Sequence, residues 1–178
     1  MLLSERQETE VSSAAAPELL IRPFHPGDEH AFKSLNEEWI TQYFRLEPKD
    51  QESLSHPQRT ILDRGGRILF AVIDGACVGC CALVRINDSQ AAVPEFEVAK
   101  MAVSPAHRKA GIGRKLLHAA VEEGWRLGAK RLYLETNHVL TPAIHLYESL
   151  GFVHLDPERV TPSPYARADV YMELLLSA

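Results

Sequence analysis

Apolar and polar positions alternate along this 178-residue chain with two different periods. A period of two is typical of a strand with one buried face, and a period near 3.6 is typical of a helix. The runs that predict strands are residues 19–24, 67–73, 76–86, 96–103, 131–135, 152–155 and 168–176. The runs that predict helices are residues 26–40, 56–63, 113–127 and 141–150.

The order of these runs predicts the fold class. Strands dominate the first half and then alternate with helices, which favours an α/β fold of the mixed α+β kind, with one sheet and helices on its faces. Asp74-Gly75, between two strand-like runs, is a strong hairpin signal. No linker divides the chain, so we expect a single domain over residues 18–178. The polar, Ser/Ala-rich composition of residues 1–17 predicts a disordered leader.

Composition narrows the class of protein. The net charge of −5 disfavours a nucleic-acid-binding protein, because that task needs surplus Lys and Arg. No apolar run approaches the roughly 20 residues that span a bilayer, and acidic residues interrupt the segment where a secretory signal would be apolar. Cys77, Cys80 and Cys81 are an odd number of cysteines in one apolar run, which favours reduced thiols, no bound metal and a cytoplasmic location.

The start of the helix expected after Gly113 carries an unusual combination of residues. Gly111 and Gly113 let the backbone approach a ligand closely, and the first N–H groups of a helix have no intrahelical partner. Arg108 and Arg114 add positive charge. The combination favours a phosphate site, and a plain loop with a tight turn is the alternative. A P-loop would need Gly-Lys-Ser/Thr, and a dinucleotide-binding turn would need a glycine at Leu116, so neither of these patterns fits.

Two sequence blocks around this turn resemble the signature of the GNAT superfamily of N-acetyltransferases. FEVAKMAVSPAHRKAGIGRKLL is similar to the family's strand and Arg-x-x-Gly-x-Gly turn, and LETNHVLTPAIHLYESLGF is similar to its next strand and helix. Together the blocks cover about residues 93–155, in the order and spacing of a small, bacterial-type, single-domain member. The chain departs from the pattern at Lys109, where many members have a glycine.

The resemblance implies a GNAT acyl-CoA N-acyltransferase fold, with a central, mostly antiparallel sheet whose central strands splay apart between flanking helices. It also implies that acetyl-CoA is the co-substrate, with its pyrophosphate on the N–H groups of the glycine turn and its pantetheine arm along residues 101–103. The residues that the resemblance assigns to this binding are Met101, Ala102, Val103, Arg108, Lys109, Ala110, Gly111, Ile112, Gly113, Arg114, Asn137 and Tyr147.

The resemblance assigns the chemistry to two side chains. Tyr147 matches the family's frequent general acid, which protonates the departing thiolate. Glu97 lies where several amine acetyltransferases of the family carry a base, and Glu95 or a water molecule is the alternative. Strand parity places Glu97 and Met101 on one side of the sheet, barring a bulge.

The acceptor is expected in a groove between the first helices and the last loop, where Trp39, Tyr43, Arg45 and Arg167 are candidate contacts. It would be a primary amine of a small molecule, amino-acid-like or a polyamine, with an aminoglycoside or a peptide also open. The expected function is therefore an acetyl-CoA-dependent N-acetyltransferase (EC 2.3.1 type) that works by direct attack. The alternative is a catalytically silent acyl-CoA-binding sensor or interaction module. A homodimer is compatible with this fold.

Overall fold

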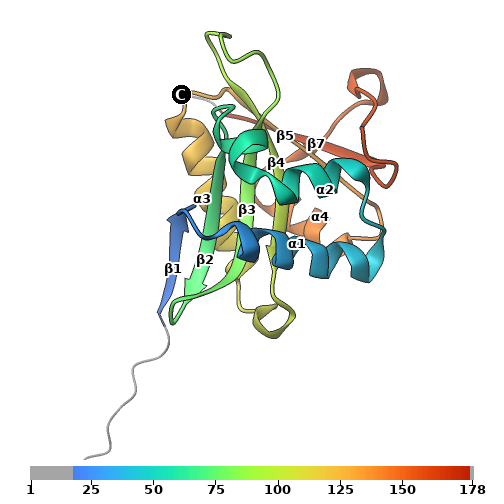
Figure 1. Ribbon diagram of the computed structural model, residues 1–178. Helices are drawn as coiled ribbons and strands as arrows, with labels where there is room; N and C mark the ends of the chain where they lie inside the picture. The colour runs from blue at the N-terminus through green and yellow to red at the C-terminus, as the bar shows by residue number, and fades with distance from the viewer. Residues whose placement is uncertain (1–17, 177–178) are drawn as a thin grey trace, which may run out of the picture.

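The computed structural model describes residues 18–176, so the leader expected over residues 1–17 lies outside the described residues. One seven-stranded sheet has the order β1-β2-β3-β4-β5-β7-β6 (Figure 1). Its strands are β1 (Leu19–Pro23), β2 (Arg67–Ile73), β3 (Ala76–Arg85), β4 (Glu95–Val103), β5 (Arg131–Thr136), β6 (Val153–His154) and β7 (Val170–Leu175). Every neighbouring pair is antiparallel except β4 and β5, which are parallel. The predicted fold class, a mostly antiparallel sheet flanked by helices, is confirmed.

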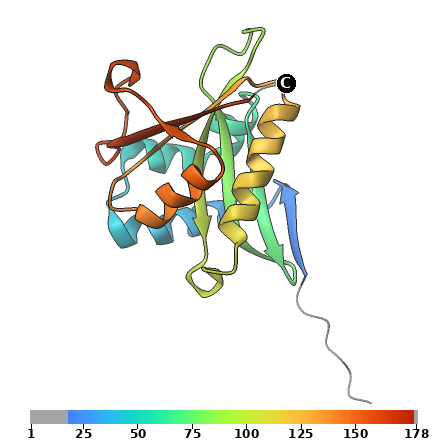
Figure 2. The same ribbon diagram turned by 180° about the vertical axis from the view of Figure 1, so that it is seen from behind.

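Helices cover both faces of the sheet. They are α1 (Glu29–Tyr43), α2 (Pro48–Ser55), a π-helical turn (Gln58–Leu62), α3 (Ile112–Arg126) and α4 (Thr141–Ser149). The helices α1 and α2 lie on one face, and α3 and α4 lie on the other, as the view from behind shows (Figure 2). We refer to these two faces as the α1/α2 face and the α3/α4 face.

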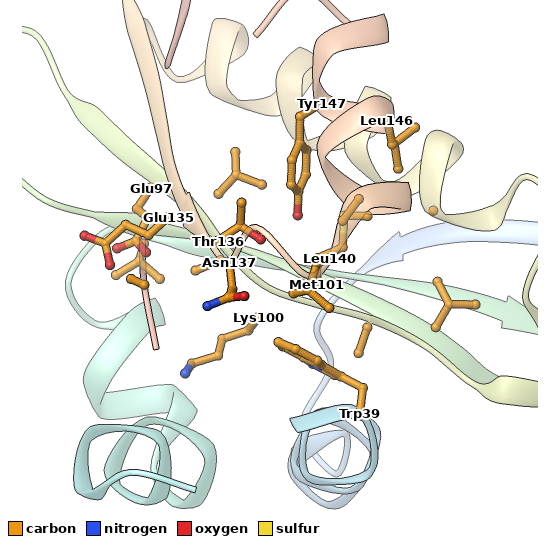
Figure 3. A pocket seen from close by; sticks show the side chains of 18 of the residues that line it. Trp39, Glu97, Lys100, Met101, Glu135, Thr136, Asn137, Leu140, Leu146 and Tyr147 are labelled. Atoms are coloured by element: carbon orange, nitrogen blue, oxygen red, sulfur yellow. The ribbon is translucent and has the colours of Figure 1, made fainter. Parts of the chain in front are cut away.

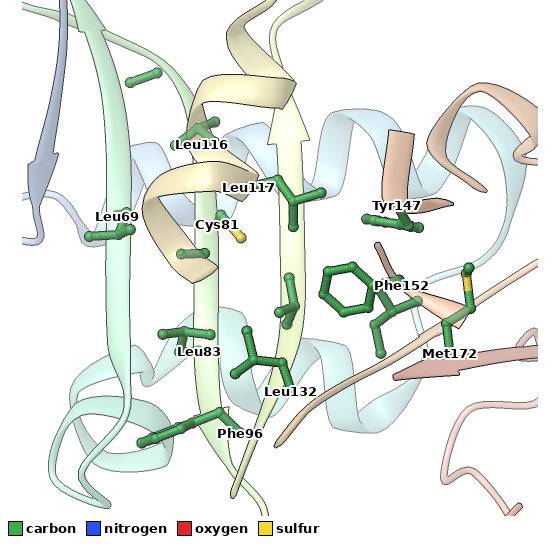
Figure 4. Packing of buried hydrophobic residues seen from close by; sticks show 14 of the residues in the cluster. Leu69, Cys81, Leu83, Phe96, Leu116, Leu117, Leu132, Tyr147, Phe152 and Met172 are labelled. Carbon is green, nitrogen blue, oxygen red and sulfur yellow. The ribbon is translucent and has the colours of Figure 1, made fainter. Parts of the chain in front are cut away.

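Each face has its own apolar core. On the α3/α4 face, Leu116 and Leu117 of α3 pack among strand residues that include Leu83 and Leu132 (Figure 4). On the α1/α2 face, Phe32 and other apolar residues one helical turn apart in α1 are buried against β2 and β3. The helical periods that predict α1 and α3 are therefore the periods of their buried faces.

The β2–β3 hairpin forms where Asp74-Gly75 predicts it. Asp74 has a φ of 49° and Gly75 a φ of 79°. Positive φ at both central residues is the requirement of a type I′ turn, whose twist matches that of the flanking strands. The turn sets the register that pairs Ile73 with Ala76.

The region between α1 and β2 differs from the prediction. Sequence periodicity predicts a helix over 56–63, whereas the structure has α2 at Pro48–Ser55 followed by the short π-helical turn. Polar interactions, which a hydrophobic pattern does not reveal, hold α2. Pro48 occupies its first position, and Glu47 and Asp50 form a capping box in which the Asp50 carboxylate accepts the Glu47 N–H at 3.0 Å.

The two central strands part after a short contact. β4 pairs with β5 only through Glu95, Phe96 and Glu97. β4 then has a bulge at Lys100, whose φ is 51°, where its register against β3 shifts between Ala99 and Ala102. The splayed central strands are thus present.

The bulge changes which residues share a face. Phe96 and Val98 belong to the core of the α3/α4 face, and Met101 and Val103 pack against the same core. Ala102, two residues past the bulged Lys100, belongs to the core of the α1/α2 face instead. The expectation that Glu97 and Met101 point to one side is therefore wrong, because one extra residue in a strand reverses the alternation beyond it.

Gly66 holds the π-helical turn against the sheet. Its N–H donates to the carbonyl oxygen of Ile61 at 2.9 Å. A Cβ at Gly66 would lie 2.5 Å from the carbonyl oxygen of Leu83 and 2.8 Å from that of Ile61, which are backbone atoms that cannot give way. The close approach therefore requires a residue without a side chain.

We expect Gly66→Ala to lower the free energy of unfolding by about 3 kcal/mol, because it overpacks this contact. Gly75→Ala is the matched control, since its Cβ would meet nothing within 4 Å and only the positive φ opposes it. That control should cost about 1 kcal/mol. Denaturant titration measures both, and equal losses would contradict the packing argument.

Candidate functional site

A cavity of about 1070 Å³ opens where β4 and β5 diverge. Its walls come from α1, α2, β4, the start of α3, the end of β5, α4 and the segment 165–168. Figure 3 shows Tyr147 of α4 and Trp39 of α1 reaching toward it from opposite faces of the sheet, with side chains of β4 and β5 between them. Segments far apart in the sequence therefore meet at a single concave site.

One end of the cavity is lined by the glycine turn that precedes α3. Lys109 and Gly111 have φ values of 65° and 75°, so the chain curls through two left-handed residues before Ile112 begins the helix. The N–H of Lys115 donates to the carbonyl of Gly111 at 3.1 Å. The N–H groups from Lys109 to Arg114 have no acceptor among residues 18–176. Such a curl of unpaired N–H groups at the positive end of a helix dipole is an anion-binding arrangement.

The basic residues of this turn bridge to other elements. The Arg108 guanidinium donates to the carbonyl of Val103 at 3.2 Å and to the side chain of Gln42 in α1 at 3.2 Å. Arg114 donates to the Ser149 hydroxyl of α4 at 2.8 Å. Both arginines line the cavity.

The structure brings together most of the residues that the resemblance assigns to the coenzyme. The members that line the cavity are Met101, Ala102, Val103, Arg108, Lys109, Gly111, Ile112, Gly113, Arg114, Asn137 and Tyr147. Ala110 is exposed and is not among the lining residues. The Asn137 side chain is engaged within the protein, because it donates to the Arg167 carbonyl at 2.7 Å and accepts the Val139 N–H at 2.9 Å. Its amide therefore fixes the loop beside the cavity.

Two carboxylates from neighbouring strands lie together at the other end of the cavity. Figure 3 shows Glu97 of β4 beside Glu135 of β5. Burial raises the pKa of Glu97 to about 7, and the nearby negative charge of Glu135 adds to this rise, against smaller opposing effects of Lys49 and Lys100. Hydroxyl groups of Tyr133, at 3.0 Å, and of Ser163 donate to the Glu135 carboxylate.

Glu95 does not share this position. Its carboxylate accepts from the Arg131 guanidinium at 3.1 Å and does not line the cavity. Of the two candidate bases in β4, only Glu97 therefore reaches the site.

Tyr147 is buried in α4 with its ring 6.0 Å from that of Phe152. Its hydroxyl points toward the cavity (Figure 3) and has no hydrogen-bond partner among residues 18–176. Burial raises the pKa of the Tyr147 phenol above its usual value, so the group keeps its proton at neutral pH.

A charged cluster forms the wall of the cavity between α2 and the last loop. Lys100, on the β4 bulge, donates to the Asp50 carboxylate at 2.7 Å and to the Tyr165 hydroxyl at 3.1 Å. Arg167 contacts Asp50 with both Nη atoms, at 2.6 and 2.8 Å. The pKa of the fully buried Asp50 is lowered to about 2, because the hydrogen bonds and charges of Arg167 and Lys100 outweigh the cost of its burial. Burial lowers the pKa of Lys100 despite the favourable charge of Asp50.

The predicted acceptor contacts have mixed outcomes. Trp39, Tyr43 and Arg167 line the cavity, whereas Arg45 is exposed and does not. Sequence reasoning missed Lys100, Asp50 and Glu135 as parts of the site. A Lys that interrupts the apolar positions of a central strand is the one signal that points to Lys100, since a buried charge needs a partner.

Residues 18–176 contain no helix that is both long and apolar enough to cross a membrane. They also contain no group of three or more His, Cys, Asp or Glu side chains placed to hold a metal ion.

Comparison with known proteins shows the family. Residues 31–152 match the Acetyltransferase (GNAT) family. The uncharacterised N-acetyltransferase YjgM of Escherichia coli K12 is 40% identical over 83 residues, which cover 47% of this chain and 48% of that protein. The uncharacterised N-acetyltransferase C1271.07c of Schizosaccharomyces pombe is 28% identical over 156 residues, which cover 85% and 91% of the two chains. The structure of the acetyltransferase yncA of Salmonella typhimurium with its cofactor acetyl-CoA superposes with a TM-score of 0.68 at 20% identity, covering 90% of this chain and 95% of that one.

The chain belongs to the Acetyltransferase (GNAT) family. The match to YjgM spans about half the length of that relative. The acceptor and the roles of individual residues are therefore considered separately below.

Packing within the protein does not explain why residue 113 is a glycine. A Cβ there would make ordinary contacts, 3.5 Å from Leu146 and 3.5 Å from Met101, and alanine is the better helix former by about 1 kcal/mol. We expect Gly113→Ala to leave the free energy of unfolding unchanged or raise it, and to weaken coenzyme A binding about tenfold, because the methyl group would intrude on the cavity.

Calorimetric titration and thermal denaturation measure the two effects. Glu122→Ala, an exposed change in the same helix outside the cavity, is the control and should alter neither the affinity nor the stability by much. Unchanged coenzyme A affinity in Gly113→Ala would contradict the ligand explanation.

Proposed function

We propose that the protein transfers the acetyl group of acetyl-CoA to a primary amine of a small molecule, with Glu97 as the base and Tyr147 as the acid. The observation that carries this proposal is that both groups face one cavity, one with a pKa near neutrality and one with its proton retained. Membership of the GNAT family supports the reaction class.

The glycine turn fits the diphosphate of the coenzyme. Its N–H groups from Lys109 to Arg114 are unpaired within residues 18–176, and Arg108 and Arg114 add positive charge to the same cavity. Beyond Glu97, the edge of β4 that faces β5 has no strand partner among residues 18–176, so residues 101–103 offer backbone groups to an extended pantetheine arm. When bound, the coenzyme supplies an acetyl thioester, the group that the amine attacks.

Glu97 is suited to take a proton from the acceptor. An alkylammonium has a pKa near 10.4, so the reactive neutral amine is scarce at neutral pH. A buried carboxylate with a pKa of about 7 is partly ionised there and is a far stronger base than an exposed one. In the reaction the amine nitrogen bonds to the acetyl carbon, and Glu97 receives the proton that the nitrogen loses, directly or through water.

Tyr147 is suited to complete the transfer. The carbon–sulfur bond breaks as the amide forms, and the thiolate that leaves needs a proton. The Tyr147 hydroxyl enters the cavity from α4 without a protein acceptor among the described residues, so its hydrogen is free to be donated. The proton that it gives up is restored from solvent.

We expect Glu97→Gln to lower kcat/KM about 100-fold, because the amide cannot accept the proton. In the unaltered protein, kcat/KM should rise with pH through about 7, since the ionised form of Glu97 is the active one. The variant should lose that inflection. Glu95→Gln is the matched control and should stay within about twofold, because Glu95 pairs with Arg131 outside the cavity. A large loss in Glu95→Gln and none in Glu97→Gln would overturn the assignment of the base.

We expect Tyr147→Phe to lower kcat about 10- to 100-fold while the coenzyme A dissociation constant and the thermal stability stay nearly constant. The constancy follows because the hydroxyl has no partner among residues 18–176 and the ring packing is kept. Thiol-release kinetics and calorimetry measure the two quantities. Tyr171→Phe removes a hydroxyl outside the cavity and serves as the control. Full turnover in Tyr147→Phe would rule out the acid role.

A further inference from the structure

One wall of the cavity is lined by positively charged side chains, and the carboxylate that pairs with them does not line the cavity. We call Lys100, Tyr165 and Arg167 the cationic wall, and all three line the cavity. Asp50, which pairs with both cations, is fully buried and does not line the cavity. Glu47, which also pairs with Arg167 at 3.4 Å, does not line the cavity either, so the two cations line it while their anionic partners do not.

The cationic wall keeps unused hydrogen-bond donors. A lysine ammonium has three N–H donors, and Lys100 uses one on Asp50 and one on the Tyr165 hydroxyl. Because that phenol oxygen accepts from Lys100, its own hydrogen is left to donate, and it has no acceptor among residues 18–176. Arg167 contacts Asp50 through its two Nη atoms, and its Nε–H likewise has no acceptor within the described chain. The wall thus holds donors that bond to no described residue, on side chains that line the cavity.

The wall is held rigidly by three elements. Asp50 ties α2 to the β4 bulge and to the last loop, and Glu47 accepts the Ala166 N–H of the same loop at 3.0 Å. The Tyr165 ring lies between the two cations, 4.8 Å from the Lys100 Nζ and 4.6 Å from the Arg167 guanidinium carbon. Donors that are fixed in advance bind a ligand without a further ordering cost.

The same cavity carries negative charge elsewhere. Glu97 and Glu135 come from β4 and β5, and an acceptor amine would approach them (Figure 3). Cations nevertheless outnumber anions along the walls around the acceptor region. The lining cations of α2, the following turn, β3, β4 and the last loop are Lys49, Arg64, Arg85, Lys100 and Arg167, and the lining anions of these elements and β5 are Glu52, Glu97 and Glu135. Behind this lining, Asp50 pairs with Lys100 and Arg167 and Glu47 pairs with Arg167, so the excess of cations is confined to the lining itself.

We propose that the acceptor is an amino acid, a small molecule whose amine lies toward Glu97 and Glu135 and whose carboxylate binds the donors of the cationic wall. The proposal rests on the proposed function and names its substrate class. The carboxylate would accept from Tyr165 and from the free donors of Lys100 and Arg167. An amine that lacks the carboxylate leaves these donors unpaired, which is how a polar site rejects the wrong substrate.

Matched ligand pairs test the proposal without altering the protein. Free amino acids with different spacings between amine and carboxylate are each compared with their own carboxamide, and spermidine is included as a polycation. With acetyl-CoA saturating, kcat/KM for at least one amino acid should exceed that of its carboxamide about tenfold or more. The proposal would be overturned if kcat/KM for the carboxamides, or for spermidine, equalled or exceeded that of every amino acid.

A binding measurement separates this proposal from the reaction itself. Calorimetry with coenzyme A present should show heat for the preferred amino acid and at least tenfold weaker binding of its carboxamide. If no amine releases thiol while this preference persists, the proposed function fails and the carboxylate site stands. If thiol release occurs and no amino acid is preferred in rate or binding, the carboxylate site fails and the proposed function stands.

Two variants locate the site on the cationic wall. Tyr165→Phe keeps the ring and removes the free hydroxyl donor, and should raise KM for the amino acid about tenfold while the carboxamide changes less than twofold. Lys49→Met removes an exposed cation whose Nζ lies 5.7 Å from the centre of the Tyr165 ring, beside the cationic wall, and should raise the same KM about threefold. Lys130→Met, an exposed change outside the cavity, is the matched control and should have no effect. Equal effects on the amino acid and its carboxamide would contradict the assignment.

Discussion

The brief contact between β4 and β5 is the constraint on which the site depends. The two strands run parallel and pair over Glu95–Glu97 and Arg131–Tyr133, and then they separate. A continued ladder would fill the space between them with paired backbone and leave no cavity. The separation exposes one edge of β4 in the middle of a sheet whose other neighbours remain paired. Tyr147 of α4 and the segment 165–168 of the last loop line the same cavity as β4, and Tyr147 reaches toward it (Figure 3).

The bulge at Lys100 changes the face of the sheet to which the following side chains of β4 point. Before the bulge, Glu97 lies beside Glu135 in the cavity (Figure 3), and after it Met101 and Val103 pack on the α3/α4 face, near the glycine turn. The Lys100 side chain itself turns to Asp50, which fixes α2 and the last loop against the strand. One extra residue therefore brings Glu97, Met101 and Lys100 to a single cavity although they do not share one face of the strand.

The hydrophobic pattern predicts those parts of the fold that packing alone determines. The helices α1 and α3, the β2–β3 hairpin and the central strands follow from their periods and from Asp74-Gly75. The hydrophobic pattern does not predict α2, because a capping box and the ion pairs of Asp50 stabilise this helix. The partners of Asp50 are Lys100 and Arg167, which lie 50 and 117 positions away in the sequence. No local pattern encodes such long-range partners.

The site shows the same division. The glycine turn and Tyr147 belong to local motifs and can be identified from the sequence. The proximity of Glu97 to Glu135, and the position of Arg45 outside the cavity, depend on how strands and loops meet. The bulge cannot be predicted from the sequence either. Lys100 is a non-glycine residue with a positive φ, and its side chain forms a buried ion pair with Asp50, which is distant in the sequence. Tertiary polar contacts thus decide what the hydrophobic pattern leaves open.

Hydrogen exchange at the glycine turn tests the central claim most directly. The amides of residues 109–114 have no acceptor among residues 18–176, so they should exchange rapidly in the free protein. Adding coenzyme A should slow their exchange markedly, while the amides of the β2–β3 hairpin turn stay unchanged. Exchange at residues 109–114 that is unaffected by saturating coenzyme A would contradict the account.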